Sequence, residues 1–133
     1  MSFLLDTNIC SAHLKHPGAV AHRMLQHSGR IFISSIVLGE LLTWAYRRSD
    51  PPPLVRQIKQ ELLADVTVLN YDHSCAERFG QLRGSLLQRG VSVSPVDLMI
   101  ASVALTHDLV LVTHNIRDFS SIPDLHLEDW IAS

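Results

Sequence analysis

Apolar and polar residues follow two patterns along this chain, which predict strands and helices in turn. Short apolar runs that end on polar residues are typical of buried strands, whereas apolar residues spaced three and four apart are typical of helices. The predicted strands are residues 3–5, 30–34, 66–69, 109–113 and a short last one at 125–127. The predicted helices are residues 9–14, 19–26, 35–48, 54–64, 74–89 and 95–106.

Polar residues and prolines mark the ends of these elements. Ser34 or Ser35 is a good cap for the third helix, and Ser94 followed by Pro95 is a strong helix start. Asp72 or Ser74 starts the helix between them, and Gly90 ends it. The run 49–53 contains three prolines and predicts a stiff loop that is too short to divide domains.

The alternation of strands and helices predicts the α/β class, with a mostly parallel sheet of about five strands. Crossover connections between parallel strands are right-handed, so helices are expected on both faces. The near-continuous apolar character of the strands agrees with burial on both sides. A length of 133 residues fits one domain, residues 1–133.

Composition narrows the function classes. With 47% hydrophobic and 18% charged residues, the chain is globular rather than disordered. No apolar run approaches the roughly 20 residues that span a bilayer, and an acid at position 6 argues against a signal peptide. Cys10 and Cys75 form no CxxC motif and are expected to be reduced thiols of a cytoplasmic protein. A net charge of −2 offers no basic field, so a nucleic-acid role needs local arginines or bound cations.

Three acids occupy positions at which a carboxylate needs an explanation. Asp6 ends the first predicted strand, where it either caps the next helix or faces a ligand. Asp97 lies in the first turn of a helix, where the dipole alone favours an acid. Glu40 lies four residues from Ile36 and from Trp44, so we expect it to point inward with the apolar stripe, where a buried Glu needs a partner such as Arg47.

In a right-handed wound sheet these acids can converge on one edge, together with Asn115 and Asp118 after the last main strand. Two carboxylates about 4 Å apart repel by about 4 kcal/mol at an effective dielectric of 20, so such a cluster needs protons or a cation. Oxygen ligands favour Mg²⁺ or Mn²⁺, and a carboxylate site with open positions suits phosphodiester hydrolysis.

At this point the residues resemble a known family. Its motifs are Asp6-Thr7-Asn8 after a strand, Glu40 in a helix that starts at a serine, Ser94-Pro95-x-Asp97-x-x-Ile100, and Thr113 before Asn115. In order and spacing they resemble the PIN domain, in particular the VapC-type toxins of bacterial toxin–antitoxin pairs. The resemblance implies a PIN-like parallel sheet, a metal-dependent endoribonuclease activity and an antitoxin partner.

The resemblance also assigns roles to residues. Asp6, Glu40 and Asp97 would be catalytic and would bind Mg²⁺ or Mn²⁺, while the side chains of Thr7, Asn8 and Thr113 would orient them. Many relatives carry a fourth acid where this chain has Asn115, so either Asn115 or Asp118 would take that position.

Other candidates have weaker support. His13, His16, His22 and His27 lack zinc-finger spacing and are expected to be solvated, whereas His114 lies beside the expected site and could meet RNA. Arg83, Arg89 and Arg117 could neutralise substrate phosphates or simply be solvated. A mean hydropathy of +0.17 and apolar residues in helices 19–26 and 54–63 favour a homodimer.

Two other functional classes compete with a nuclease. A receiver-like signalling module is also a small wound α/β domain, but it needs a late lysine, and the only lysines here are Lys15 and Lys59. An inactive PIN-like scaffold would bind partners only, and the presence of Asp6, Glu40 and Asp97 together argues against it.

Overall fold

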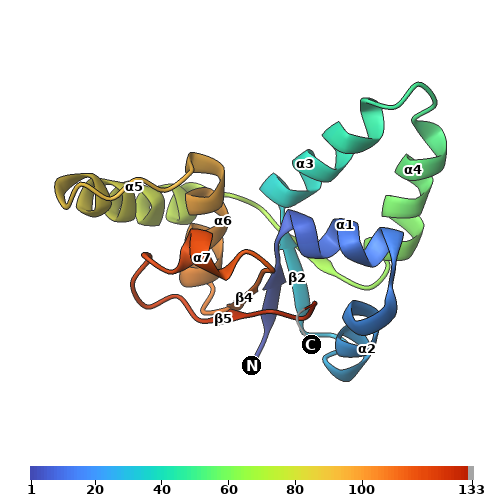
Figure 1. Ribbon diagram of the computed structural model, residues 1–133, viewed down its shortest axis with the longest axis horizontal. Helices are drawn as coiled ribbons and strands as arrows, with labels where there is room; N and C mark the ends of the chain where they lie inside the picture. Colours follow the sequence, from blue (N-terminus) through green and yellow to red (C-terminus); the bar gives the residue numbers. More distant parts are fainter. Residues whose placement is uncertain (132–133) are drawn as a thin grey trace.

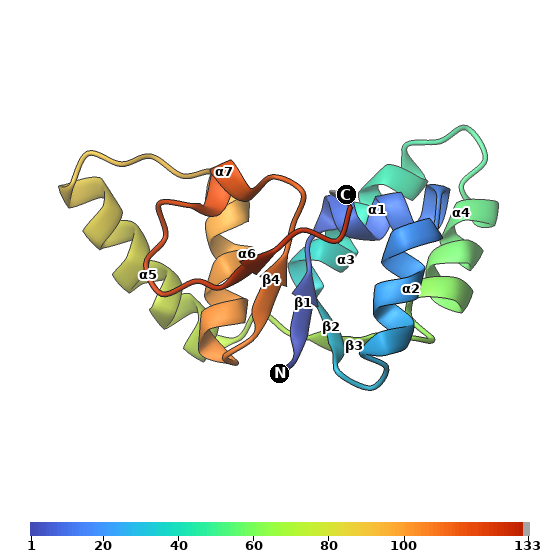
Figure 2. The same cartoon turned by 60° about the horizontal axis from the view of Figure 1, so that its bottom comes forward.

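The computed structural model describes residues 1–131, so the last two residues of the predicted domain lie outside the described part. Within it, five strands form one sheet in the order β3-β2-β1-β4-β5, and every neighbouring pair is parallel. Figure 2 shows β4, β1, β2 and β3 side by side. The α/β prediction with a parallel sheet is confirmed. The strands are β1 (Phe3–Leu5), β2 (Ile31–Ser34), β3 (Thr67–Leu69), β4 (Val110–Val112) and β5 (Leu127–Glu128).

Helices cover both faces of the sheet and fall into two groups. Figures 1 and 2 show α1 to α4 on one side of β1, and α5, α6 and α7 on the other. None of the helices within residues 1–131 has the length and apolar character to span a membrane. The helices are α1 (Thr7–Lys15), α2 (Gly18–Gln26), α3 (Ser35–Tyr46), α4 (Pro52–Gln57), the π-helix η1 (Ile58–Leu62), α5 (His73–Gln88), α6 (Pro95–Thr106) and α7 (Ile116–Phe119).

The strand order contains a switch point between β1 and β4. From β1 the chain winds outward through β2 to β3, and it then crosses back to place β4 on the other side of β1. The loops after β1 and β4 therefore lead to opposite faces, which leaves a crevice at the carboxyl ends of these two strands. Crevices of this kind are the usual ligand sites of open parallel sheets.

The pairing of β1 with β4 brings the ends of these strands together. Leu5 is in register with Val112, and the Asp6 amide continues the ladder by donating to the Val112 carbonyl at 3.0 Å. The three residues of β1 are almost fully buried because helices pack against both of its faces. Asp6 and Thr113 therefore lie next to each other at the switch point, where β1 and β4 end.

Three predicted boundaries were wrong, each for a local reason. Helix α1 begins at Thr7 rather than residue 9, because Asp6 itself caps it. Helix α4 begins at Pro52, since proline fits the first turn of a helix, and it continues as a π-helix instead of a regular helix to residue 64. The last strand is Leu127–Glu128 instead of residues 125–127.

The predicted caps are mostly confirmed. The Ser34 hydroxyl accepts from the Val37 amide at 3.1 Å, and Asp72 accepts from the Cys75 amide at 3.1 Å. Gly90 follows α5 with a φ of 71°, a left-handed conformation that suits glycine. Ser94 precedes α6 as predicted, but its hydroxyl makes no capping hydrogen bond, so the start of this helix relies on Pro95 and backbone geometry.

Candidate active site

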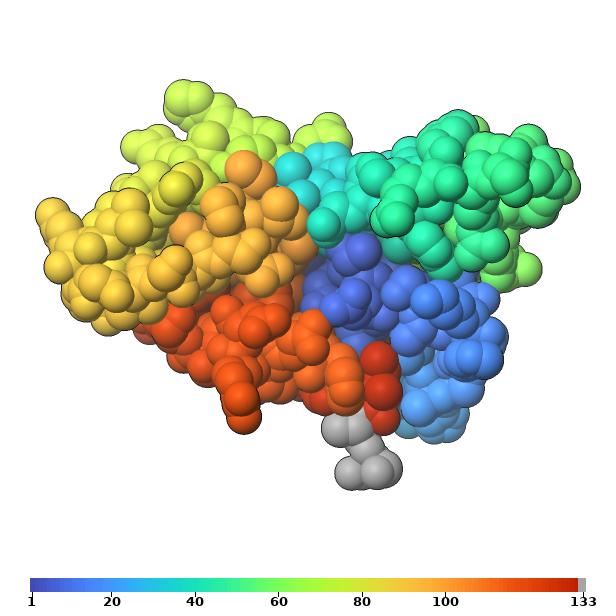
Figure 3. Space-filling model, turned by 45° about the horizontal axis from the view of Figure 1, so that its top comes forward, coloured from blue at the N-terminus to red at the C-terminus, as the bar shows by residue number. Residues whose placement is uncertain are grey.

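An open pocket of about 150 Å³ lies at the switch point. Asp6 supplies its floor, Glu40 comes from α3, Asp97 from α6 and Asp118 from α7. Figure 3 shows the start of α1 in dark blue, α3 in cyan and α6 in orange meeting on one face. The structure thus brings the three predicted catalytic acids to one place, together with both candidates for the fourth position. The complete lining is Asp6, Thr7, Asn8, Glu40, Asp97, Ile100, Asn115, Asp118 and Phe119.

Asp6 is a buried carboxylate that can both cap helix α1 and face a ligand in the pocket. It is 5% exposed, and its Oδ1 accepts from the Ile9 amide at 2.9 Å, so it does cap α1. Burial raises the pKa of Asp6, hydrogen bonds from the Thr113 side chain and the Ile9 amide oppose this, and the charge of Glu40 raises it further. The cap therefore fixes the side chain while leaving it on the pocket floor.

Thr113 links the end of β4 to the pocket. It is fully buried, its side chain hydrogen-bonds Asp6, and its hydroxyl oxygen accepts from the Asn115 amide at 3.0 Å. That second bond shapes the turn that presents Asn115 and Asp118 at the pocket wall. One threonine thereby supports both sides of the site.

The expected orientation of Glu40 was wrong. Its side chain is exposed rather than inward, because Val37, Leu41 and Ala45 form the buried stripe of α3 and Glu40 lies on a neighbouring face. No ion pair with Arg47 occurs among the described residues. Instead, the Thr7 hydroxyl donates to Glu40 Oε1, which tethers the carboxylate at the pocket rim.

Asp97 lies in the first turn of α6 and is half-buried. Burial is the largest influence that raises the pKa of Asp97, followed by the charges of Asp118, Asp6 and Glu40. If Asp97 only stabilised the helix dipole, three other acids would not be expected close enough to raise its pKa. The mutual repulsion identifies the pocket as a place where protons or a cation are favoured.

The donor set fits a hard divalent ion, since every acid in the pocket offers oxygen. Within residues 1–131, no three His, Cys, Asp or Glu side chains already surround a common point closely enough to hold an ion. The acids line the same pocket, but their side chains are not yet close enough together to coordinate one ion. An ion would therefore have to pull exposed side chains such as Glu40 and Asp118 toward the floor.

Ile100 and Phe119 form the apolar part of the pocket wall, a role that sequence reasoning did not assign to them. The available signal was helical spacing, because Ile100 lies three residues after Asp97. Both side chains are buried, so they restrict the pocket while the acids define its charge.

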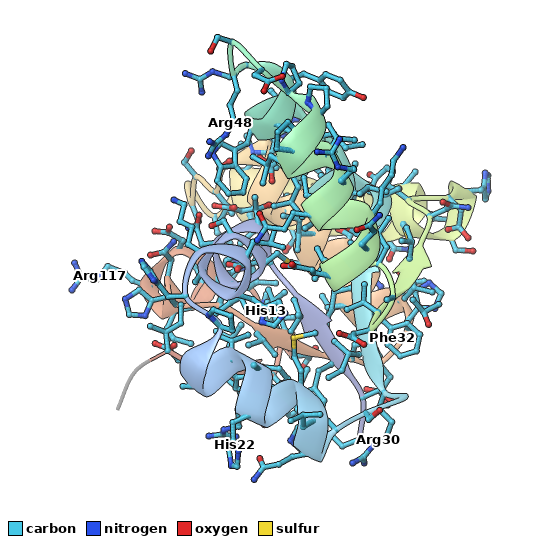
Figure 4. The ribbon with its side chains drawn as sticks, turned by 90° about the vertical axis from the view of Figure 1, so that its right-hand side faces the viewer. His13, His22, Arg30, Phe32, Arg48 and Arg117 are labelled. Atoms are coloured by element: carbon cyan, nitrogen blue, oxygen red, sulfur yellow. The ribbon has the colours of Figure 1, made fainter. Side chains whose placement is uncertain are left out.

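The expected solvation of the histidines was only partly correct. Figure 4 shows His22 pointing outward, whereas His13 is half-buried. His27 is half-buried and stacks on Trp130, with the ring centroids 5.8 Å apart. His114 is exposed and contacts Asp129 at 2.9 Å, and it does not line the pocket.

The candidate arginines also lie outside the pocket lining. Arg83 is on α5, Arg89 caps the end of that helix, and Arg117 projects into solvent (Figure 4). Among residues 1–131, the pocket lining therefore contains no basic side chain.

The sequence pattern of the PIN domain matches residues 3–125. The chain belongs to the PIN domain family. Membership of this family rules out the receiver-like signalling module as an alternative. It also agrees with the strand order of the sheet and with the acidic pocket at the switch point.

Individual PIN proteins resemble the chain over nearly its full length. It is 37% identical over 131 residues to a tRNA(fMet)-specific endonuclease VapC of Shigella flexneri, covering 98% of each chain. The VapBC2 structure from Rickettsia felis, bound to a promoter DNA fragment, superposes with a TM-score of 0.91 at 33% identity, covering 98% of this chain and 99% of the other. DNA-bound VapBC from Salmonella typhimurium gives a TM-score of 0.91 at 37% identity, covering 98% of both.

Proposed function

We propose that this protein is a metal-dependent endoribonuclease and the toxin of a type II toxin–antitoxin pair. The observation that carries the proposal is the single pocket lined by Asp6, Glu40 and Asp97 at the switch point. Relatives of matching length are named ribonucleases, and PIN-domain nucleases generally depend on divalent metal ions. On the same grounds we take residues 1–133 to be one domain.

In this proposal Mg²⁺ or Mn²⁺ is held by Asp6, Asp97 and Glu40, with Asn115 or Asp118 in the fourth position. The ion would supply charge to neutralise the phosphodiester and its leaving oxygen. Neighbouring residues of the chain hold the acids in position to bind this ion. Thr113 and the Ile9 amide hold Asp6 by hydrogen bonds, while Thr7 and Asn8 border the same side of the pocket.

Glu40 is also suited to receive a proton from the attacking water. Its Oε1 is engaged by Thr7, and its Oε2 has no hydrogen-bond partner among residues 1–131. A general base needs one available carboxylate oxygen, and Glu40 Oε2 would meet this need if Glu40 binds the ion through a water molecule rather than directly. The apolar side chains of Ile100 and Phe119 would limit water on the opposite wall.

The partners of the relatives suggest partners for this chain. Solved relatives are complexes of VapB with VapC, some bound to DNA. We propose that a small antitoxin covers the pocket face, and that the protein forms a homodimer in the cytoplasm. Cys10 and Cys75 are both free thiols, which is compatible with a reducing compartment. Exposed apolar residues such as Leu25, 78% exposed, support self-association, and a monomer in sedimentation at high concentration would refute it.

The test of the activity is cleavage of a circular single-stranded RNA by purified protein freed of any co-purifying peptide. A circle has no ends, so only an endonuclease can linearise it. We expect linear product in Mn²⁺ and none in EDTA. An intact circle under both conditions would favour the inactive scaffold.

A further inference from the structure

A tryptophan flanked by two cations lies on the surface beside the acidic pocket. Lys15 Nζ is 5.1 Å from the Trp44 ring centroid, and Arg48 Cζ is 5.2 Å from it. Trp44 is half-buried, whereas Lys15 and Arg48 are exposed. We call these three residues the Trp44 cluster. Lys15 ends α1, Trp44 lies on α3 and Arg48 just follows α3, so two packed helices hold the cluster together.

A hollow of about 180 Å³ runs from Lys15 and Trp44 of this cluster to residues that also border the acidic pocket. It is lined by Lys15 and Trp44 at one end and by Thr7 and Asn8 at the other, and Thr7 and Asn8 also line the acidic pocket. Thr7 and Lys15 are eight positions apart on α1, which is about 12 Å along the helix. A short single strand lying in the acidic pocket would therefore reach the Trp44 cluster.

We infer that the Trp44 cluster holds single-stranded RNA next to the cleavage site, with a nucleobase stacked on Trp44 and phosphates paired with Lys15 and Arg48. The inference rests on the proposed function and specifies where its substrate binds. Aromatic faces combined with cations are the usual means of binding single strands. The chain has a net charge of −2, so phosphates need local positive charge to approach the acids.

A second pair of a cation and an aromatic ring lies on α5, away from the acidic pocket. Arg83 lies over the Phe79 ring on α5, with a separation of 5.8 Å. The hollow beside Arg83 shares no lining residue with the acidic pocket. The pair on α5 therefore lacks the shared lining residues that place the Trp44 cluster next to the acidic pocket, and it provides an aromatic control.

Fluorescence can report on this site directly, because the chain has two tryptophans and Trp130 is 2% exposed. The experiment uses the Trp130→Phe variant in an Asp97→Asn background, so that Trp44 is the only tryptophan and turnover is suppressed. A short single-stranded RNA is titrated in Mn²⁺. We expect Trp44 emission to be quenched with saturation. An unchanged emission while the RNA binds would overturn the inference.

A second measurement avoids any change in the core. Binding of labelled RNA is followed by anisotropy, at several salt concentrations, with Trp130 retained. Trp44→Ala should weaken binding about 5- to 150-fold, the range for one stacked base. Lys15→Ala with Arg48→Ala should reduce the salt slope by about 1.4, for two lost phosphate contacts. Phe79→Ala and the matched charge control Lys59→Ala with Arg78→Ala should leave affinity and slope unchanged.

The outcomes separate this inference from the proposed function. If the wild type linearises circular RNA and the Trp44 cluster variants bind and cleave as it does, the inference fails and the nuclease stands. If the wild type never cleaves RNA, the proposed function fails. Quenching of Trp44 by an antitoxin peptide but not by RNA would assign the cluster to a protein partner and overturn the inference.

Discussion

The hydroxyl of Thr7 donates a hydrogen bond to the carboxylate of Glu40, joining the first turn of α1 to the middle of α3. Glu40 is exposed, and an exposed glutamate without such a bond would sample many rotamers. The residue after Asp6 therefore positions a second acid of the same pocket. Asp6 and Glu40 are far apart in sequence, but one short segment controls both.

Thr7→Val should weaken catalysis without unfolding the protein. The change removes the donor to Glu40 and keeps the shape of the side chain. Residues that orient metal ligands typically contribute 10- to 100-fold, so we expect cleavage in Mn²⁺ to fall by roughly that factor. Thr7→Ser keeps the hydroxyl and should retain most activity, and equal loss in both variants would show that this hydrogen bond is not the cause.

Asp97→Asn should separate the structural from the catalytic role of this residue. Burial and the neighbouring acids raise the pKa of Asp97, so its ionised form is less favourable in the folded protein than in the unfolded chain. Loss of a charge near the α6 dipole destabilises by only about 0.3–1 kcal/mol. We expect the free energy of unfolding in EDTA at pH 7 to hold or rise, measured by urea melts, while RNA cleavage falls by more than 100-fold.

The control for this variant is Asp50→Asn, which removes a charge from an exposed loop residue outside the pocket lining. It should change neither stability nor cleavage. An Asp97→Asn protein that is less stable in EDTA but still active would assign Asp97 to the helix start alone.

Millimolar Mn²⁺ should raise the melting temperature of the wild type. A ligand that binds only the native state stabilises it by about 2.7 kcal/mol at 100 times its dissociation constant. Here the ion would also relieve repulsion among Asp97, Asp118 and Glu40. The rise should be smaller in Asp97→Asn, and a wild-type melting curve indifferent to Mn²⁺ would speak against a shared site.

His13 should make stability depend on pH. Burial lowers the pKa of His13, against the opposing charges of Asp65 and Glu61, and its buried Nδ1 has no hydrogen-bond partner in the described chain. The folded pKa is thus below the unfolded value of about 6.5, so stability from neutral His13 is present above pH 6.5 and is lost as the pH falls.

The comparison is between the wild type and His13→Leu in urea melts from pH 7.5 to pH 5. We expect the wild type to lose stability relative to the variant as the pH falls, because the unfolded wild type binds a proton at His13 more readily than the folded protein does. Effects of Asp6 and Asp97 are common to both proteins and cancel. A constant difference across this range would contradict the prediction.

Sequence pattern predicted the sheet and the convergence of the acids because both follow from topology. Once strands and crossovers are assigned, Asp6 and Thr113 must emerge at the same edge. The orientation of Glu40 could not be derived in this way. Apolar residues occur all around α3, so spacing alone did not distinguish the buried stripe at Val37 and Leu41 from the side facing the pocket.

Features that depend on contacts between distant segments were also missed. His13 is half-buried because α1 packs against α2 and η1, a relation absent from its local sequence. The Trp44 cluster likewise joins Lys15 to residues about thirty positions later. The π-helix after Gln57 has no signal in hydrophobic spacing, since the apolar positions Leu54, Ile58 and Leu62 fit a regular helix equally well.

The central claim is that the acids at the switch point form one metal-dependent centre for RNA cleavage. The most direct measurement is the initial rate of RNA cleavage by peptide-free protein, with and without Mn²⁺, for the wild type and for Asp6→Asn. We expect that cleavage requires Mn²⁺ and that Asp6→Asn reduces the rate by more than the 10- to 100-fold typical of supporting residues. Cleavage that persists in EDTA, or an Asp6→Asn protein as active as the wild type, would contradict it.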